Sequence, residues 1–273
     1  MPGTVATRCA RWAEPMNPNV SPAARIDVVL IASGKYHDID YARLELLKLL
    51  GEDECMRVRV FEDYANLDAI RASRFLVTYT CDVVPSLEQQ EALRVWVEGG
   101  GRWLALHGTN SILRFLDSGL VDSPAWAPHL MQTLGTQFIA HPPIAPYRVE
   151  VADPEHPLVR GIEPFETTDE LYLLDAHPGL QVLLDTEFEG AAEGFVRDRW
   201  PRARHPVMYL RELGQGAVLY LTLGHCRGHY DLQPLMDYWP SVDRCAWELP
   251  VFHELLRRGL AWAGTRDIPH IPT

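Results

Sequence analysis

Polar loops that carry histidine follow three of the predicted strands. His37 closes the loop 33–37, His107 directly follows an apolar segment, and His225 follows the second strand of a predicted hairpin. Ligands bind beyond the carboxyl ends of the strands in an open parallel sheet. Imidazole both transfers protons near neutral pH and binds metal ions. We therefore expect these three side chains to meet at one site, although each could instead be an ordinary hydrogen-bonded loop histidine.

The position of His107 is typical of a nucleophile elbow, the sharp turn between a strand and a helix in many acyl-transfer enzymes. An apolar strand, one polar residue and the small Gly108 occur in that order, and this pattern pushes the polar side chain out above the sheet. Acyl transfer needs a serine or a cysteine at this point. Because the residue is histidine, we expect no covalent acyl intermediate here.

Two adjacent carboxylates, Asp169 and Glu170, form a second candidate group. A carboxylate beside an imidazole raises the imidazole pKa and fixes its tautomer, so one of the pair would orient a histidine or take a proton. The alternative is that the pair caps a helix. The catalytic candidates are His107, His225, Asp169 and Glu170. The candidate substrate-binding residues are Lys35, Tyr36, His37, His141, Tyr172 and His229.

Metal binding is an alternative use of the same histidines. The sequence has no H-E-x-x-H motif. His225 and His229 are four residues apart, but the intervening Arg227 and Gly228 favour a loop over a helix. Loop histidines can still converge on a divalent ion, and His107, His225 and His37 would be its first ligands. No G-x-G-x-x-G segment follows a strand, so we expect no dinucleotide cofactor.

The elements that must position these residues alternate between strand and helix in the first half of the chain. Continuous apolar runs indicate strands buried on both faces, and Ser86 with Gln89 forms a capping box. Repeated β-α-β units imply a parallel sheet with helices on both faces. The predicted strands cover 26–32, 57–61, 75–80 and 102–106, and the predicted helices cover 41–50 and 86–98.

The second half is less regular. Residues 117–146 hold several Pro and Gly and predict an excursion over the sheet. Segments 207–213 and 217–223 flank Gly214-Gln215-Gly216, which is typical of a hairpin. The remaining predicted elements are strands over 147–151 and 181–184, a long loop over 224–249 and a helix over 250–262.

The amino-acid composition of the chain limits the kinds of partner that we expect it to bind. The chain has 273 residues, with 25 Lys and Arg against 37 Asp and Glu, for a formal charge of −12. An acidic chain without a basic stripe is a poor binder of nucleic acid, and no apolar run is long enough to span a bilayer. Five scattered Cys without a C-x-x-C pair fit a reducing cytoplasm. We expect a flexible arm over 1–24, a single α/β domain over 25–266 and a tail over 267–273.

A series of short motifs follows one another along the chain. The motifs are 99–101 with 104–108, 134–135 with Phe138 and His141-Pro142, His156-Pro157 with Gly161, 169–172, 214–216 with 221–225, and 258–262. Each motif is weak alone, but their order is specific and resembles the ThuA-like (trehalose utilisation) family over about residues 26–264. The resemblance implies a flavodoxin-like fold similar to class I glutamine amidotransferases. Those enzymes carry their nucleophilic Cys at the elbow, where this chain has His107, so no glutamine hydrolysis is expected.

What the resemblance implies about function is a role in carbohydrate catabolism beside a sugar oxidoreductase. The leading hypothesis is an enzyme that isomerises, eliminates from or hydrolyses a sugar or 3-keto-glycoside. His107 and His225 would act as acid and base or as ligands, Asp169 or Glu170 would orient one of them, and His37 and Lys35 would bind hydroxyls or an enolate. A non-catalytic sugar-binding or regulatory protein and a metal-dependent hydrolase are the alternatives.

The sequence departs from the family pattern most clearly in the loop 226–249, which is longer than usual. Its aromatic residues could stack on a sugar ring, pack within the loop, or form a contact between copies of the chain in a homo-oligomer. They are Tyr230, Tyr238, Trp239 and Trp247.

Overall fold

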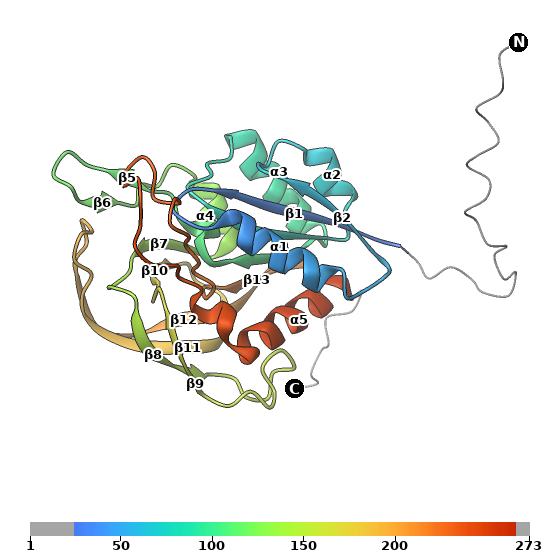
Figure 1. Ribbon diagram of the computed structural model, residues 1–273. Coiled ribbons are helices and arrows are strands. Elements are labelled where there is room, and N and C mark those ends of the chain that lie inside the picture. The colour runs from blue at the N-terminus through green and yellow to red at the C-terminus, as the bar shows by residue number, and fades with distance from the viewer. Residues whose placement is uncertain (1–24, 266–273) are drawn as a thin grey trace, which may run out of the picture.

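A nine-stranded sheet forms the centre of the computed structural model, which describes residues 25–265 (Figure 1). Five adjacent strands of this sheet are parallel, and four further strands extend it on one side with antiparallel pairing. In spatial order the parallel strands are β2 (Met56–Phe61), β1 (Ile26–Gly34), β3 (Phe75–Cys81), β4 (Arg102–Leu106) and β13 (Gly216–Leu221). The antiparallel strands are β12 (Arg199–Leu213), β11 (Leu180–Ala191), β8 (Ala145–Val151) and β9 (Phe165–Asp169).

Helices cover both faces of the parallel strands. The helices α1 (Ile39–Leu50) and α5 (Pro250–Gly264) lie on one face, and α2 (Leu67–Ala72), α3 (Leu87–Glu98) and α4 (Pro128–Leu134) lie on the other (Figure 1). Successive residues of β1 divide between the two cores, because side chains alternate across a strand. Leu30 packs in the core that contains Leu256 of α5, whereas Ile31 packs in the core that contains Leu93 of α3.

This architecture confirms the predicted α/β fold class, with a parallel central sheet and helices on both faces. Every residue of β3 and β4 is buried, which explains why their sequences are mostly apolar and contain only Thr78, Thr80 and Arg102 as polar or charged residues. The capping box is also present, since the Ser86 side chain accepts from the Gln89 N–H and the Gln89 side chain accepts from the Ser86 N–H.

The antiparallel extension is longer than the sequence predicts. A strand was expected over 181–184, but β11 runs from Leu180 to Ala191, and its partner β12 has fifteen residues. The pairing of these two strands shifts register at three places. Each shift interrupts the alternation of polar and apolar residues from which a strand is recognised.

The excursion between β4 and β8 forms a small layer beside the sheet. It contains the 3-10 helix η3 (His107–Asn110), the short hairpin of β5 (Arg114–Phe115) and β6 (Val121–Asp122), helix α4, and β7 (Thr136–Ala140), which pairs with β10 (Leu173–Ala176). Figure 1 shows β5 and β6 on the side of the molecule opposite the start of β1. A third apolar cluster, which includes Phe138, Tyr172 and Phe195, packs in this layer.

The predicted arm over 1–24 and the predicted tail over 267–273 lie outside the described residues. None of the helices within 25–265 combines the length and the apolar character needed to cross a membrane.

The packing of α5 generates a first prediction. Leu256 is fully buried between α5 and the sheet, so Leu256→Ala should lower the free energy of unfolding by about 2–5 kcal/mol, through lost burial and the cavity left behind. Urea denaturation followed by circular dichroism measures this change. Leu44→Ala is the matched control, because Leu44 is 52% exposed on α1, and it should change stability by no more than about 0.5 kcal/mol. Equal effects of the two substitutions would contradict the packing described.

Candidate functional site

Four side chains meet at the ends of four strands. His37 follows β1, His107 follows β4, His225 follows β13, and Glu170 follows β9. All four side chains are buried. The sequence predicted that the three histidines would converge, and the structure brings them together with one of the two candidate carboxylates.

The backbone at His107 is strained. Its φ of 42° lies in the left-handed region, which a residue with a side chain adopts only when its surroundings enforce it. Gly108 makes the turn fit, because a Cβ at this position would lie 2.7 Å from the carbonyl oxygen of Thr80. This is the strained turn that the sequence pattern of an elbow predicts.

The ring nitrogens and the carboxylate form a tight group. His37 Nε2 lies 2.9 Å from His107 Nε2. Glu170 Oε2 lies 3.5 Å from His107 Nε2 and 3.9 Å from His37 Nε2. The other oxygen, Oε1, lies 3.1 Å from His225 Nδ1. One atom from each residue can be chosen so that all four lie within 4.8 Å of one another.

Backbone carbonyls set the tautomers of two of these rings. His37 Nδ1 lies 3.0 Å from the carbonyl oxygen of Lys35, and His107 Nδ1 lies 2.8 Å from that of Thr222. A carbonyl oxygen can only accept a hydrogen bond, so each Nδ1 carries a proton and donates it. When these rings are neutral, both Nε2 atoms therefore present lone pairs to the centre of the group.

The charge of Glu170 dominates the electrostatics. Burial alone would raise the pKa of this carboxyl, but the facing imidazoles of His141 and His225 outweigh burial and hold its pKa well below the usual range. Burial lowers the pKa of His225 to about 3, against the opposing pull of Glu170. At neutral pH the group thus contains a carboxylate and a neutral His225.

Asp169 does not join this group but holds its backbone in place. Its carboxylate accepts the N–H groups of Glu170, Gly224, His225 and Ala246, at 2.7 to 3.2 Å. Burial raises the pKa of Asp169 to about 6, against these hydrogen bonds and His107, so it is ionised at neutral pH. Asp169 ends strand β9 and no helix begins after it, so the alternative that Asp169 and Glu170 cap a helix is wrong.

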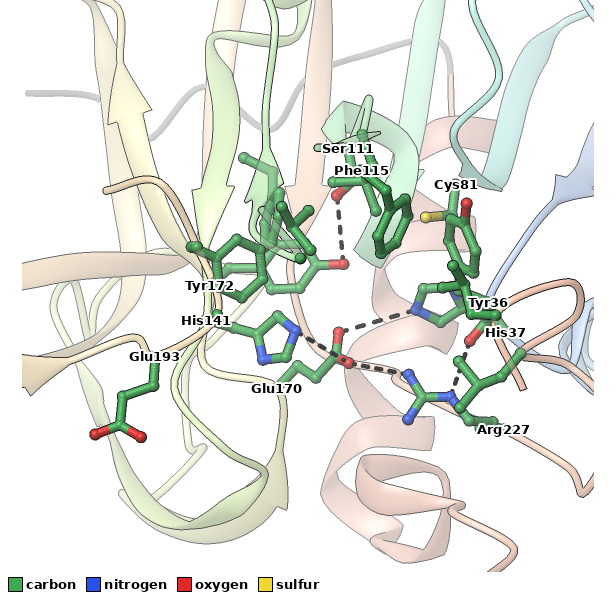
Figure 2. Close-up of a pocket in the computed structure, with 18 residues that line it drawn as sticks. Tyr36, His37, Cys81, Ser111, Phe115, His141, Glu170, Tyr172, Glu193 and Arg227 are labelled. Carbon is green, nitrogen blue, oxygen red and sulfur yellow. Dashed lines mark hydrogen bonds and ion pairs between the residues drawn. The ribbon is translucent and has the colours of Figure 1, made fainter. Parts of the chain in front are cut away.

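A cavity of about 300 Å³ opens beside the group. His37, Glu170, His141, Tyr172 and Arg227 line its polar side, as Figure 2 shows. The aromatic rings of Tyr36, Phe115, Phe138 and Phe195 line other parts of the wall. His107 and His225 are fully buried and do not line the cavity. They would therefore act on a ligand through His37, Glu170 or Tyr172 and not by direct contact.

Two further predicted residues contact the group from the side of the cavity. The Tyr172 hydroxyl lies 3.1 Å from His107 Nε2. His141 Nε2 lies 3.6 Å from Glu170 Oε1, while His141 Nδ1 donates to the carbonyl oxygen of Pro142 at 2.8 Å. Figure 2 shows the His141 ring directed toward the Glu170 carboxylate.

Lys35 and His229 lie apart from the group. The Lys35 ammonium is exposed and pairs with Asp82 at 2.7 Å. His229 hydrogen-bonds the carbonyl oxygen of Trp239 and stacks on Tyr238. Neither residue lines the cavity, so their predicted role in substrate binding stays a prediction that this geometry does not favour.

Arg227 is the main component that sequence reasoning missed. Its guanidinium lies 3.5 Å from Glu170 Oε1, and its Nε donates to the carbonyl oxygen of Tyr36 at 3.1 Å (Figure 2). Asp243 also lies 3.8 Å from this guanidinium. Arg227 stands between His225 and His229 in the predicted loop, and that position was the available signal.

Comparison with known proteins agrees with this fold. The family model described as trehalose utilisation, ThuA, matches residues 28–238. A putative ThuA-like protein from Bacteroides uniformis has a similar structure, with a TM-score of 0.62 at 16% identity over 92% of this chain and 95% of that chain. A putative ThuA-like protein from Parabacteroides merdae gives a TM-score of 0.60 at 17% identity, over 91% and 93%. No curated protein sequence matches this chain.

The contacts of Asp169 generate a second prediction. Asp169→Asn replaces one acceptor oxygen with an NH₂ group that faces backbone N–H donors, so the free energy of unfolding should fall by about 1–3 kcal/mol. Amide hydrogen exchange should accelerate at Gly224, His225 and Ala246 beyond the global change. Glu166→Gln is the control, since Glu166 is exposed on the same strand. Unchanged exchange at these three amides would show that Asp169 does not hold the loop.

Proposed function

This chain is a member of the ThuA family, and from that premise we propose that it acts on a sugar or a 3-keto-glycoside by proton transfer in the cavity. The observation that carries the proposal is the placement of His141 Nε2, which faces the cavity with the Glu170 carboxylate 3.6 Å behind it. This pair can take and return a proton at a ligand held against the aromatic wall.

The cavity suits a ligand of the size and polarity of a sugar. Its volume of about 300 Å³ is at the lower end for small-molecule sites. A sugar ring has apolar C–H faces and polar hydroxyl edges. The aromatic side chains would pack against the ring face, while Arg227 and His37 would hydrogen-bond the hydroxyl edge.

A 3-keto sugar makes proton transfer chemically accessible. The carbonyl group acidifies the adjacent C–H bond, whose electron pair becomes the enolate when the proton leaves. His141 carries its own proton on Nδ1, so Nε2 is free to accept this one. Glu170 stabilises the imidazolium that forms, and the guanidinium of Arg227 lies in position to stabilise the enolate oxygen. If the neighbouring hydroxyl passes its proton to the enolate oxygen and His141 returns its proton to the former carbonyl carbon, the ketone moves by one carbon, which is isomerisation. If the glycosidic oxygen instead leaves as an alcohol with the proton from His141, the outcome is elimination.

Acyl transfer through a cysteine fits this site poorly. Cys81 is the cysteine that lines the cavity, and burial holds the pKa of its thiol well above the usual value. The thiolate is the nucleophilic form, so this side chain stays unreactive at neutral pH. We accordingly propose that the chain has no glutamine amidotransferase activity.

A 3-keto-glycoside arises when a glycoside is oxidised at C3, so the proposed partner in metabolism is a sugar oxidoreductase. We propose a cytoplasmic location for both. Cys55, Cys81, Cys226 and Cys245 are free thiols, which a reducing compartment maintains.

The role of His141 generates a third prediction. His141→Asn keeps a polar side chain but cannot take a proton, so kcat on a 3-keto-glycoside should fall by about 10²- to 10⁴-fold. The assay follows the loss of the proton signal next to the carbonyl by NMR in D₂O, which detects proton abstraction whatever the final product.

His129→Asn is the matched control, because His129 is exposed on α4 and does not line the cavity. It should leave kcat unchanged. Full activity of the His141→Asn protein would refute the proposed base. If a panel of 3-keto-glycosides binds to the wild-type protein without any proton exchange, the chain is a sugar-binding module and not an enzyme.

A further inference from the structure

We propose that His37, His107, His225 and Glu170 form a binding site for one divalent transition-metal ion, which faces the cavity. The inference shares its cavity with the proposed function, but metal binding can be measured without any substrate. Three lines of geometry support it: the tautomers of two rings, the burial of the third, and the spacing of the donor atoms.

The first line is the lone pairs of His37 and His107. Because both Nδ1 atoms donate to backbone carbonyls, both Nε2 atoms of the neutral rings would carry lone pairs, and these two atoms lie only 2.9 Å apart. Such facing lone pairs repel each other unless a cation lies beside them. A backbone carbonyl that holds the far nitrogen is also the usual arrangement around a metal-binding histidine.

The second line is His225. Its ring is fully buried, and neither ring nitrogen makes a hydrogen bond in the described part of the chain. Nδ1 lies 3.1 Å from Glu170 Oε1, but without the geometry of a hydrogen bond. A buried polar atom without a partner costs about 1–3 kcal/mol, and a bound ion would provide one for Nδ1.

The third line is the donor set and its spacing. In a tetrahedral site with bonds of about 2.0–2.1 Å, the donor atoms lie about 3.3 Å apart. The shortest distances between donor atoms of the group are 2.9, 3.1 and 3.5 Å, and all four donor atoms lie within 4.8 Å of one another. Modest side-chain movements would therefore bring all four atoms to bonding distance from one ion. Three imidazoles with one carboxylate favour a transition-metal ion over Mg²⁺ or Ca²⁺, most of all a borderline ion such as Zn²⁺, while the carboxylate also suits Mn²⁺.

The position of the ion links it to the cavity. His37 and Glu170 line the cavity, and His107 and His225 lie behind them. An ion held by these four residues would lie at the wall of the cavity, where an oxygen of a keto-sugar would add to it as a fifth ligand. His141, 3.6 Å from Glu170, would remain outside the ligand set and free to transfer a proton.

Metal content tests this inference directly. The full-length chain, without a histidine tag, is treated with a chelator, dialysed and titrated with Zn²⁺ or Mn²⁺ by calorimetry, with elemental analysis of the product. We expect one ion per chain and a rise in melting temperature on binding. Co²⁺ in place of Zn²⁺ should give the visible absorption of a site with nitrogen and oxygen ligands.

Variants separate this site from adventitious binding. Glu170→Gln and His225→Asn should each weaken affinity by about 100-fold or more, given that even groups outside the ligand set change it 10- to 100-fold. His129→Asn should bind as the wild type does. Circular dichroism of the chelated proteins shows whether each variant is folded, and two independent variants guard against the misfolding of one.

The outcomes separate this inference from the proposed function. Substoichiometric binding of both ions to the wild type would overturn the metal site, and so would unchanged affinity in both folded variants. The short contact between His37 and His107 would then be explained by a proton shared between their Nε2 atoms. Stoichiometric binding without proton exchange in a 3-keto-glycoside would support the metal site and refute the proposed reaction. Proton exchange that persists in the chelated protein would leave the reaction intact and refute a catalytic ion.

Discussion

A buried carboxylate needs compensating charge, and this need organises the site around Glu170. Transfer of an ionised carboxylate from water into a protein interior is too costly unless partners surround it. Here the partners are four imidazoles and the guanidinium of Arg227, at 3.1 to 3.9 Å. They come from four separate segments of the chain, since His225 and Arg227 share one, so the carboxylate is stable only when the strand ends have converged.

The convergence depends on supports that never touch the cavity. Asp169 holds the backbone of the segment that carries His225 through the N–H groups of Gly224 and His225, and it also accepts from the N–H groups of Glu170 and Ala246. The strained turn at His107 is held by Tyr220, whose hydroxyl donates to the His107 carbonyl at 2.6 Å and accepts from the Asn110 N–H. Backbone strain of this kind costs about 1–3 kcal/mol and persists only where the surroundings over-determine it. The strained turn thus lowers the stability of the fold, but it positions the buried ring of His107.

The sequence predicted the parallel half of the fold and the meeting of His37, His107 and His225, since buried strands leave a continuous apolar signal and their ends share one edge. It could not decide between Asp169 and Glu170. Successive side chains of an extended segment point in opposite directions, so one carboxylate faces the histidines and the other faces the loop. Which one does so depends on the register of β9, an edge strand whose pairing partner is β8. Arg227 was missed for a related reason, because the course of a long loop follows from tertiary contacts.

The division of the histidines into two groups constrains the chemistry. His107 and His225 do not line the cavity, so a proton that they exchange with a ligand must pass through His37, Glu170 or Tyr172. A cation at the centre removes this difficulty, because the inner rings then act as ligands and need no route to the substrate. An ion of charge +2 beside one carboxylate also leaves the site positive, which suits a substrate oxygen that gains negative charge. A shared proton in place of the ion would leave His37, His107, His225 and Glu170 with no net charge among them. The inner rings are therefore better suited to holding a cation, while His141, at the edge of the cavity, is better suited to moving a proton.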